Sequence, residues 1–361
     1  MKIVIIGGGL IGLLTARELS LAGQEVTVIE QGQFGEESSW AGGGILSPLY
    51  PWEYADSVNA LALWSQQNYP DLVKDLVKTS NIDPQWTKSG LLVLDEDKFE
   101  VAQDWATSYG LDCQVLDARQ LQQDEPELII GPHTGLLFPD IAQVRNPRMI
   151  KSMLGSCRNL GIELVENTTV KSLLIKDNIV TGVVTELAEV TADKVVVCAG
   201  AWSAHLLTQV GIKVDVKPLR GQMIMFRTPP GLINRITLFK GHYLIPRRDG
   251  RVLVGSTLED VGFDKSTTAD ALEELKQFAQ QLFPVLNQYE IERQWSGLRP
   301  ATPNGVPYIS AIPEMVNLYI NAGHFRNGVI LGPASARLAA DLILEREPSL
   351  EPSFYEIHQP H

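Results

Sequence analysis

The first thirty residues contain the pattern that most constrains the fold. Residues 2–6 form a short apolar run rich in β-branched side chains, which predicts a buried strand. This run leads directly into the sequence GGGLIG at 7–12, which has the GxGxxG spacing, and leucines then recur at helical intervals as far as Gly23. A second apolar run, 26–29, ends at Glu30. The order of strand, glycine turn, helix, strand and acid predicts a Rossmann-like α/β fold.

The three glycines of this spacing have separate mechanical roles in binding a pyrophosphate. Gly7 permits the tight turn, Gly9 lets the backbone approach the phosphates, and Gly12 lets the helix pack closely on the strand. The start of the helix directs its free N–H groups at the anion. Glu30, eighteen residues beyond Gly12, is placed to accept a ribose hydroxyl. A βαβ packing motif without a ligand is the alternative, but the complete set of parts in order favours a dinucleotide site.

Length and composition indicate a large globular chain without a membrane span. With 361 residues the chain is too long for one ordinary core, so we expect two intertwined domains. The fractions of hydrophobic (44%) and charged (20%) residues are typical of a soluble protein. No apolar run is long enough to cross a bilayer. The N-terminal run lacks a basic segment beyond Lys2 and a small-residue cleavage site, so we expect a cytoplasmic protein.

Charge and reactive side chains narrow the function classes. A formal charge of −13 argues against nucleic acid and anionic lipid as partners, and an anionic substrate would need a local cluster of arginines. Cys113, Cys157 and Cys198 are widely spaced and never form CxxC, which fits reduced structural thiols. The six histidines show no ligand spacing, so we predict no metal site. The sequence leaves open whether the chain forms a homo-oligomer.

The order of predicted elements indicates a discontinuous cofactor domain. Helices are expected over 59–80, 97–109, 147–160, 269–282 and 328–344, and strands over 90–94, 162–165, 170–175, 179–186, 194–200 and 318–323. We therefore assign 1–85, 145–219 and 298–361 to an FAD-binding domain, and 86–144 and 220–297 to an α+β substrate-binding domain built on a mostly antiparallel sheet. A nicotinamide-binding domain is usually contiguous, so this division favours FAD, which lies extended and needs loops from the whole chain.

The segment 323–330, GHFRNGVI, begins the last predicted helix. A helix N-terminus carries partial positive charge and unpaired N–H donors. Reduced flavin is negatively charged near N1, so a helix start directed there would stabilise the reduced cofactor. The alternative is a glycine-rich turn with an incidental basic residue.

Two further residues are candidates for binding a carboxylate. Arg299 precedes a proline that fixes the backbone, and a rigidly held guanidinium suits bidentate capture of a carboxylate. A surface ion pair is the alternative. Tyr243 shares a predicted strand face with Ile245, from which its hydroxyl would reach the same ligand. The alternative for Tyr243 is a core position with a satisfied hydroxyl.

Together these motifs resemble the D-amino-acid oxidase superfamily of flavoproteins, and within it the glycine oxidases of the thiamine-biosynthesis type. The resemblance extends over nearly the whole chain: GGGLIG with Glu30, SSWAGGGIL, VVVCAGAWS, GHYLIPRRDGRVLVGST, WSGLRPATPNGVPYI and AGHFRNGVILGPA. The last two motifs are specific to this branch, whereas GxGxxG is not.

The resemblance implies FAD as the cofactor and assigns its contacts. The matching positions are Gly7, Gly9, Leu10, Ile11, Gly12, Glu30, Gln31, Ser38, Ser39, Gly43, Gly44, Ile45, Val170, Gly200, Trp202, His324, Phe325, Arg326, Asn327, Gly328, Val329 and Ile330. Arg299 and Tyr243 match the residues that hold the substrate carboxylate, and Arg326 matches a further substrate-side position. Ile45 and Leu258 stand where the compared family member has methionines over the flavin. No cysteine lies in the C-terminal stretch where monomeric sarcosine oxidase, a cousin, links its flavin, which implies non-covalent FAD.

The implied reaction is oxidation of glycine, sarcosine or a small D-amino acid to the imine, with dioxygen reduced to hydrogen peroxide. The imine then hydrolyses to the oxo acid and ammonia or passes to thiazole synthesis. We expect Tyr243, Leu258, Ile45 and Trp295 to flank the substrate and to favour small amines. The alternatives are an FAD-dependent D-amino-acid dehydrogenase with another electron acceptor, a flavin-binding subunit without turnover, and an NAD-linked dehydrogenase.

Overall fold

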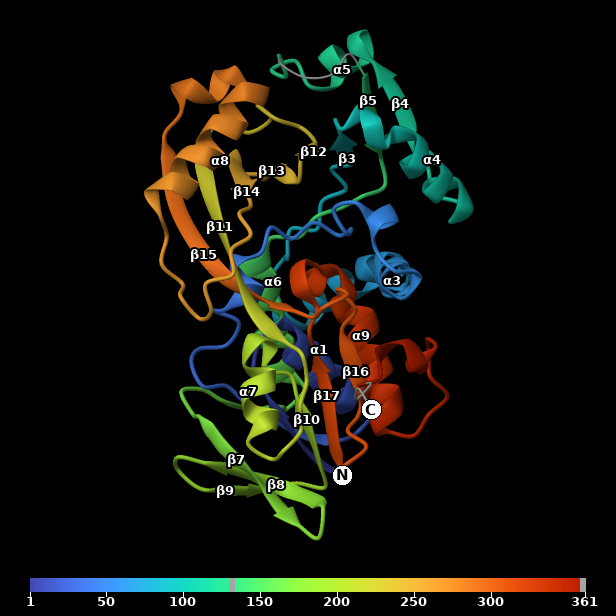
Figure 1. Ribbon diagram of the computed structural model, residues 1–361, viewed down its shortest axis with the longest axis vertical. Coiled ribbons are helices and arrows are strands. Elements are labelled where there is room, and N and C mark those ends of the chain that lie inside the picture. Colours follow the sequence, from blue (N-terminus) through green and yellow to red (C-terminus); the bar gives the residue numbers. More distant parts are fainter. Residues whose placement is uncertain (130–133, 358–361) are drawn as a thin grey trace.

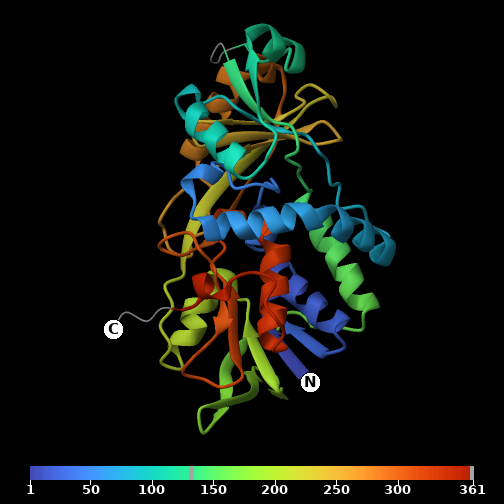
Figure 2. The same cartoon turned by 90° about the vertical axis from the view of Figure 1, so that its right-hand side faces the viewer.

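The computed structural model describes residues 1–129 and 134–357. Figure 1 shows an elongated molecule with one sheet in the upper part, a second sheet in the lower part and the three-stranded sheet β7–β9 at the bottom. The long helix α3 (Asp56–Ser80) runs across the molecule between the upper and lower parts (Figure 2). The described residues include no helix that is both long and apolar enough to traverse a lipid bilayer.

The lower part is built on a six-stranded sheet in the order β16-β17-β10-β1-β2-β6. All neighbours are parallel except β16 and β17. The strands are β1 (Lys2–Ile6), β2 (Glu25–Ile29), β6 (Glu163–Val165), β10 (Lys194–Val197), β16 (Tyr308–Ala311) and β17 (Leu318–Ala322). Three separated stretches of chain therefore meet in one sheet, and β1 lies between its sequence neighbour β2 and the distant β10.

The two faces of this sheet are covered by different elements. Side chains alternate along β1, so Ile3 and Ile5 pack in a core formed with α1, α3, α6 and α9, while Val4 and Ile6 pack in a second core with α7 and the sheet β7–β9. The helices are α1 (Leu10–Leu21), α6 (Asn146–Asn159), α7 (Ser203–Thr208) and α9 (Gly328–Ile343). The three-stranded sheet comprises β7 (Val170–Lys176), β8 (Ile179–Thr185) and β9 (Glu189–Thr191).

The upper part is an eight-stranded sheet in the order β15-β11-β14-β13-β12-β3-β5-β4. Every neighbouring pair is antiparallel except β12 with β3. Its strands are β3 (Leu91–Val93), β4 (Gln114–Asp117), β5 (Thr134–Phe138), β11 (Lys217–Arg227), β12 (Ile236–Phe239), β13 (His242–Pro246), β14 (Arg251–Gly255) and β15 (Ile291–Ala301). Helix α8 (Ala269–Leu282) packs on one face of this sheet and α4 (Phe99–Ser108) on the other. The apolar residues of the two helices accordingly belong to two different cores. The prediction of an α/β fold with a second, mostly antiparallel sheet is confirmed.

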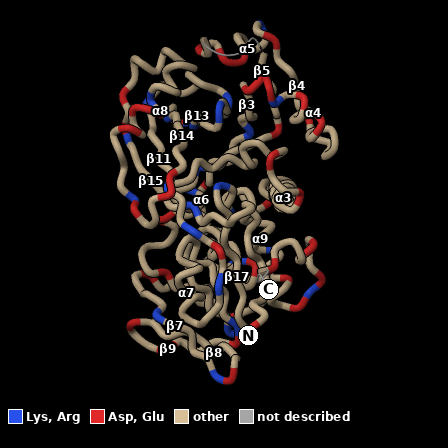
Figure 3. The backbone as a smooth tube through the Cα atoms, in the orientation of Figure 1, with Lys and Arg blue, Asp and Glu red and all other residues tan. Residues whose placement is uncertain are grey.

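Most predicted elements are present with small changes of boundary. All five predicted helices form. Helix α3 begins at Asp56, three residues earlier than expected, because buried polar residues extend the buried face of the helix beyond the apolar pattern. The remaining elements are short: α2 (Ser38–Ala41), α5 (Ala118–Asp124), η1 (Pro51–Glu53), η2 (Glu96–Lys98), η3 (Gly200–Trp202), η4 (Pro284–Gln288), η5 (Phe325–Asn327) and η6 (Pro352–Tyr355). Acidic positions are prominent around α4 and α5 (Figure 3).

The predicted domain division stays a prediction. Its boundaries after 219 and 297 fall inside β11 and β15, which pair along their length and connect the lower part with the upper sheet (Figure 1). Residues 130–133 and 358–361 of the predicted domains lie outside the described residues.

Candidate active site

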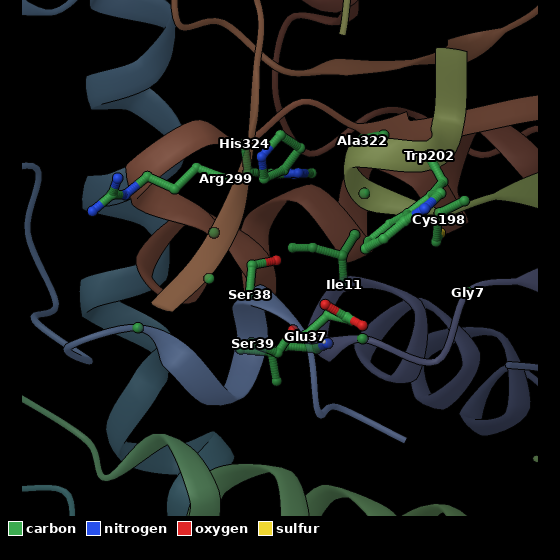
Figure 4. Close-up of a pocket in the computed structure, with 18 of the residues that line it drawn as sticks. Gly7, Ile11, Glu37, Ser38, Ser39, Cys198, Trp202, Arg299, Ala322 and His324 are labelled. Carbon is green, nitrogen blue, oxygen red and sulfur yellow. Dashed lines mark hydrogen bonds between the residues drawn. The ribbon is translucent and has the colours of Figure 1, made fainter. Parts of the chain in front are cut away.

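A cavity of about 480 Å³ lies where the parallel strands of the lower sheet end. The residues that directly follow β1, β2, β10 and β17 line it: Gly7, Glu30, Cys198 and Gly323. This is the edge at which open α/β sheets bind their ligands. The other walls come from 37–49, 168–171, 199–209, 221–256 and 297–300. The volume is within the usual range of ligand pockets. Figure 4 shows Gly7 and Cys198 towards one end of the cavity and Arg299 at the other.

The glycine turn shapes the first end of the cavity. Gly7 has φ +108°, and a side chain there would meet the Cys198 carbonyl oxygen at 2.4 Å. A methyl group at Gly12 would lie 2.0 Å from the Gly7 carbonyl oxygen, so the helix packs as closely as the sequence predicts. At the start of α1 the Leu10 N–H donates to Ser39 Oγ at 2.8 Å. The turn is therefore tied to the 38–45 loop, which lines the cavity beside it.

The Glu30 carboxylate is buried and faces the same end. Its Oε2 accepts from the Gly8 N–H at 2.7 Å, and its Oε1 accepts from the Gly32 N–H at 2.9 Å. Burial raises the pKa of Glu30, and these backbone hydrogen bonds oppose the rise. Each carboxylate oxygen has a further lone pair, so Glu30 can hold the turn and still accept a hydroxyl from a ligand.

The opposite end begins with His324, which is buried at the end of β17. Its Nε2 lies 2.7 Å from Ser335 Oγ, and Ser335 donates its hydroxyl hydrogen to Asn321 Oδ1 at 2.5 Å. Since that hydrogen is used, Ser335 accepts from His324, which places the imidazole proton on Nε2. Burial lowers the pKa of His324 to about 3, so the imidazole is neutral near pH 7.

Arg299 is fixed by three neutral acceptors at the far end of the cavity. Its Nη1 donates to the carbonyl oxygens of Thr257 (3.0 Å) and Arg220 (3.3 Å), and its Nη2 donates to Ser256 Oγ at 2.7 Å. Burial lowers the pKa of Arg299, because no counterion offsets the loss of hydration. Among the described residues no carboxylate lies within ion-pairing distance of Arg299. The sequence alternative of a surface ion pair is therefore wrong.

Tyr243 and Arg326 complete this end. Tyr243 is buried on β13, and its hydroxyl donates to Met223 Sδ over 3.9 Å, which is a weak acceptor. The central guanidinium carbon of Arg326 lies 5.3 Å from the centroid of the Phe325 ring. The Nε of Arg326 has no hydrogen-bond acceptor within the described residues. One end of the cavity is thus lined by two cations that have no acid partner among the described residues, and by a tyrosine hydroxyl whose acceptor is a sulfur atom. This set of donors suits a carboxylate ligand.

Comparison with known proteins identifies the family. The sequence model of the family described as FAD dependent oxidoreductase matches residues 2–342. The chain is 44% identical to the glycine oxidase of Pseudomonas aeruginosa over 98% of both chains. It is 32% identical to the bifunctional protein ThiO/ThiG of Trichormus variabilis, covering 96% of this chain and 53% of that protein. The crystal structure of glycine oxidase from Geobacillus kaustophilus superposes with a TM-score of 0.93, at 28% identity over 100% of this chain and 99% of that one.

The chain belongs to the FAD-dependent oxidoreductase family.

The cavity fits the cofactor of this family. The dinucleotide end offers the start of α1, where a methyl group at Gly9 would meet only Ser39 Oγ, at 3.1 Å, so the backbone is open to a phosphate. Glu30 has free acceptor capacity beside this turn. The opposite end places the segment before α9 against the cavity. Within the described chain, His, Cys, Asp and Glu side chains form no cluster of three or more that could hold a metal.

The structure brings most of the predicted FAD and substrate positions of this oxidoreductase to one cavity. They are Gly7, Gly9, Leu10, Ile11, Glu30, Gln31, Ser38, Ser39, Gly43, Gly44, Ile45, Val170, Gly200, Trp202, Tyr243, Arg299, His324, Phe325, Arg326, Asn327, Gly328 and Val329. Gly12 and Ile330 are buried behind the lining instead. The roles assigned to these residues stay predictions.

Two of the four residues expected to flank the substrate lie elsewhere. Leu258 is 49% exposed and does not line the cavity. Trp295 donates from Nε1 to the Ala41 carbonyl oxygen at 3.0 Å and lines a neighbouring cavity. Trp295 and Arg299 are four positions apart on the extended strand β15, a span of about 13 Å. Met223 and Ser256 line the site in their place; Ser256 lies within the GHYLIPRRDGRVLVGST block, where it was given no role, and Met223 lies outside every motif.

Proposed function

We propose that this chain is an FAD-dependent oxidase of glycine and other small amino acids. The observation that carries the proposal is that Arg299 and Arg326, which have no carboxylate partner among the described residues, line the cavity end that also holds the Tyr243 hydroxyl. The similarity to glycine oxidases supports glycine as the substrate.

Substrate binding follows from the positions of these donors. Arg299 uses the N–H groups left free by its three acceptors to bind the carboxylate, and Tyr243 donates a further hydrogen bond. Arg326 adds positive charge on the same side. A carboxylate held at two or more points has a fixed orientation, which directs the Cα–H bond and supplies much of the catalysis.

Among the described residues of the lining, no side-chain base for the amine lies near these donors. His324 is neutral, but its Nε2–H is committed to Ser335 and its pKa is about 3. The substrate therefore reacts as the free amine, whose lone pair assists loss of the Cα hydrogen. Bound FAD, which the start of α1 and Glu30 would hold, would supply the acceptor for this hydrogen and its electron pair, with dioxygen as the final acceptor of the two electrons. The balanced reaction is glycine, dioxygen and water to glyoxylate, ammonia and hydrogen peroxide.

We infer a place for this reaction in thiazole and thiamine biosynthesis, supported by the alignment of the whole chain with about half of the ThiO/ThiG protein. We also propose a cytoplasmic location, because all three cysteines are free.

The test is stopped-flow reduction of the purified yellow protein by glycine, first without oxygen and then in air. We expect anaerobic bleaching of the flavin by glycine and stoichiometric peroxide on admission of air. Bleaching without peroxide would identify a dehydrogenase with another acceptor, and no bleaching by any small amino acid would overturn the proposal.

A further inference from the structure

A second cavity of about 130 Å³ lies beside the main one and collects basic side chains. Four arginines line it: Arg145, Arg247, Arg251 and Arg293. The chain as a whole carries a formal charge of −13, so this gathering of guanidinium groups opposes the overall balance. Trp40 and Trp295 form part of the remaining wall, with ring centroids 5.9 Å apart.

The acids near these arginines neutralise only part of the charge. Asp249 accepts from Arg145 at 2.7 Å and from Arg251 at 2.8 Å. Glu292 accepts from Nε and Nη2 of Arg251, both at 2.9 Å. Arg293 has no ion pair in the described chain, and its guanidinium lies over the Trp40 ring, 4.4 Å from the centroid. Four cations therefore face two carboxylates.

Arg247 is the most informative member of the cluster, because it is only 7% exposed and has no acid partner. Its terminal nitrogens donate to neutral oxygens, including the carbonyls of Val144 (3.0 Å) and Gly43 (2.7 Å). Its Nε–H is buried without an acceptor among the described residues. Burial and the nearby Arg145 lower the pKa of Arg247 to about 9. A buried cation with an unused donor is costly unless an anion approaches it.

We propose that this second cavity binds a small carboxylate anion with an apolar body. Guanidinium groups match the two oxygens of a carboxylate; Arg293 supplies N–H donors that no described protein group uses, and the buried Arg247 adds positive charge to the wall. The indole walls can pack against an apolar body; because the cavity, at about 130 Å³, is smaller than an engineered protein cavity of about 150 Å³ that binds benzene, part of a benzoate ring would stay outside it. A ligand with an ammonium group is excluded by the arginines, which separates this site from one for amino acids.

The site is physically connected to the main cavity. Gly42 lines both cavities, and the Gly43 carbonyl that accepts from Arg247 belongs to a residue of the main lining. Arg247 is therefore unsuitable for a test by substitution. Arg293 is suitable, because its only described partner is the Trp40 ring. Arg227 provides a matched control: it is an exposed arginine on the same sheet, paired with Glu290 at 4.0 Å and absent from the cavity lining.

The experiment is isothermal titration of benzoate into the FAD-loaded protein. Arg299→Ala serves as the background, so that benzoate loses its proposed main-site partner. We expect one benzoate per chain, weakened at least about tenfold by Arg293→Gln, since a charged hydrogen bond is lost, and unchanged by Arg227→Gln. Benzylamine should not bind, and potassium chloride at equal ionic strength should not compete.

Several results would overturn the proposal. Equal weakening by Arg293→Gln and Arg227→Gln would show general charge attraction, and no weakening by either would place benzoate elsewhere. Binding of benzylamine would show that the cavity selects shape alone. Phosphate binding as tightly as benzoate would remove the need for an apolar body. If Arg299→Ala fails to fold, a crystal structure of the parent holoenzyme with benzoate decides the same question, through density between Arg293 and Trp295.

Discussion

Gly221 on β11 lies directly against the guanidinium of Arg299 on β15. A methyl group at 221 would lie 2.0 Å from Nη2 and 2.1 Å from the central carbon of that guanidinium. The absence of a side chain at 221 therefore determines where the predicted carboxylate-binding group can rest.

We expect Gly221→Ala to displace Arg299 and to lower kcat/KM for glycine by about a hundredfold, because a misplacement of about 1 Å has effects of that size. Steady-state kinetics with glycine measure this loss, and the flavin content of each variant serves as the control. The double variant Gly221→Ala, Arg299→Ala should lose no more than Arg299→Ala alone, because both changes act on one interaction. Additive losses would show that Gly221 acts on something else.

Removal of the Arg299 side chain should leave the substrate carboxylate without its main partner. Loss of one member of a buried ion pair costs about 3–5 kcal/mol, which is on the order of a hundred- to a few-thousand-fold in kcat/KM. FAD content should stay near that of the parent. Arg299→Lys should recover only part of the loss, because an ammonium lacks the two-pronged geometry. A kcat/KM for Arg299→Ala within about threefold of the parent would leave Arg326 as the carboxylate-binding residue.

The cofactor should be released by acid as free FAD. Cys198 lines the cavity, but it follows β10 beside the glycine turn, far from the end with Arg299 (Figure 4). Burial raises the pKa of its thiol to about 12, which keeps it protonated and unreactive. Acid precipitation followed by chromatography of the supernatant should recover all the yellow colour as FAD. Colour retained in the pellet would contradict this expectation.

Substrate preference should fall with side-chain size. Ile45, Met223 and Tyr243 line the cavity close to Arg299, so glycine and sarcosine should have higher kcat/KM than large D-amino acids. The preference should be graded, since one methylene changes binding by about 1–3 kcal/mol. Kinetics with glycine, sarcosine, D-alanine and D-phenylalanine measure it, and D-phenylalanine as the best substrate would refute the proposed assignment.

His324 should make the protein less stable in acid. Its pKa is about 3 in the folded chain against an ordinary value of 6.5, so the unfolded chain binds an additional proton between these values. Stability from the neutral imidazole is complete above pH 6.5 and is lost as pH falls towards 3, by about 1.4 kcal/mol per pH unit where the difference is one proton. Denaturant unfolding of the parent and of His324→Gln, both with excess FAD, should show a steeper acid loss for the parent. If the stability of the two proteins fell in parallel as the pH is lowered, the assigned role of His324 would be refuted.

Local patterns predicted the glycine turn and most helices because the relevant contacts lie within a few residues. Gly7 has the positive φ that the turn requires, and Gly12 packs on the Gly7 carbonyl, five residues away. The alternation that placed Tyr243 and Ile245 on one face of β13 is confirmed, since a methyl group at Gly43 would meet both side chains.

The substrate end was harder to predict because its walls come from strands that are distant in sequence. Met223 on β11 pairs with Trp295 on β15 and with Gly255 on β14, and that register follows from the packing of the whole sheet. Motifs identified Arg299 as a candidate and contained Ser256, but they did not indicate that the Ser256 hydroxyl holds the Arg299 guanidinium. The expectation that Leu258 would flank the substrate was wrong: Thr257 and Glu259, on either side of it, bond to the backbone of β11, while the Leu258 side chain is 49% exposed and outside the lining.

The strand order β17-β10-β1 has a consequence for how this protein is made in the cell. On the ribosome, β1 emerges first, but its neighbour β10 is complete only at residue 197 and β17 only at 322. Until then the nascent glycine turn has an open strand edge beside it, which exposes it to unwanted pairing with other chains. FAD can be captured only after almost the whole chain has been translated. Premature termination before β17 should therefore yield colourless, aggregation-prone fragments, however intact their N-terminal motif.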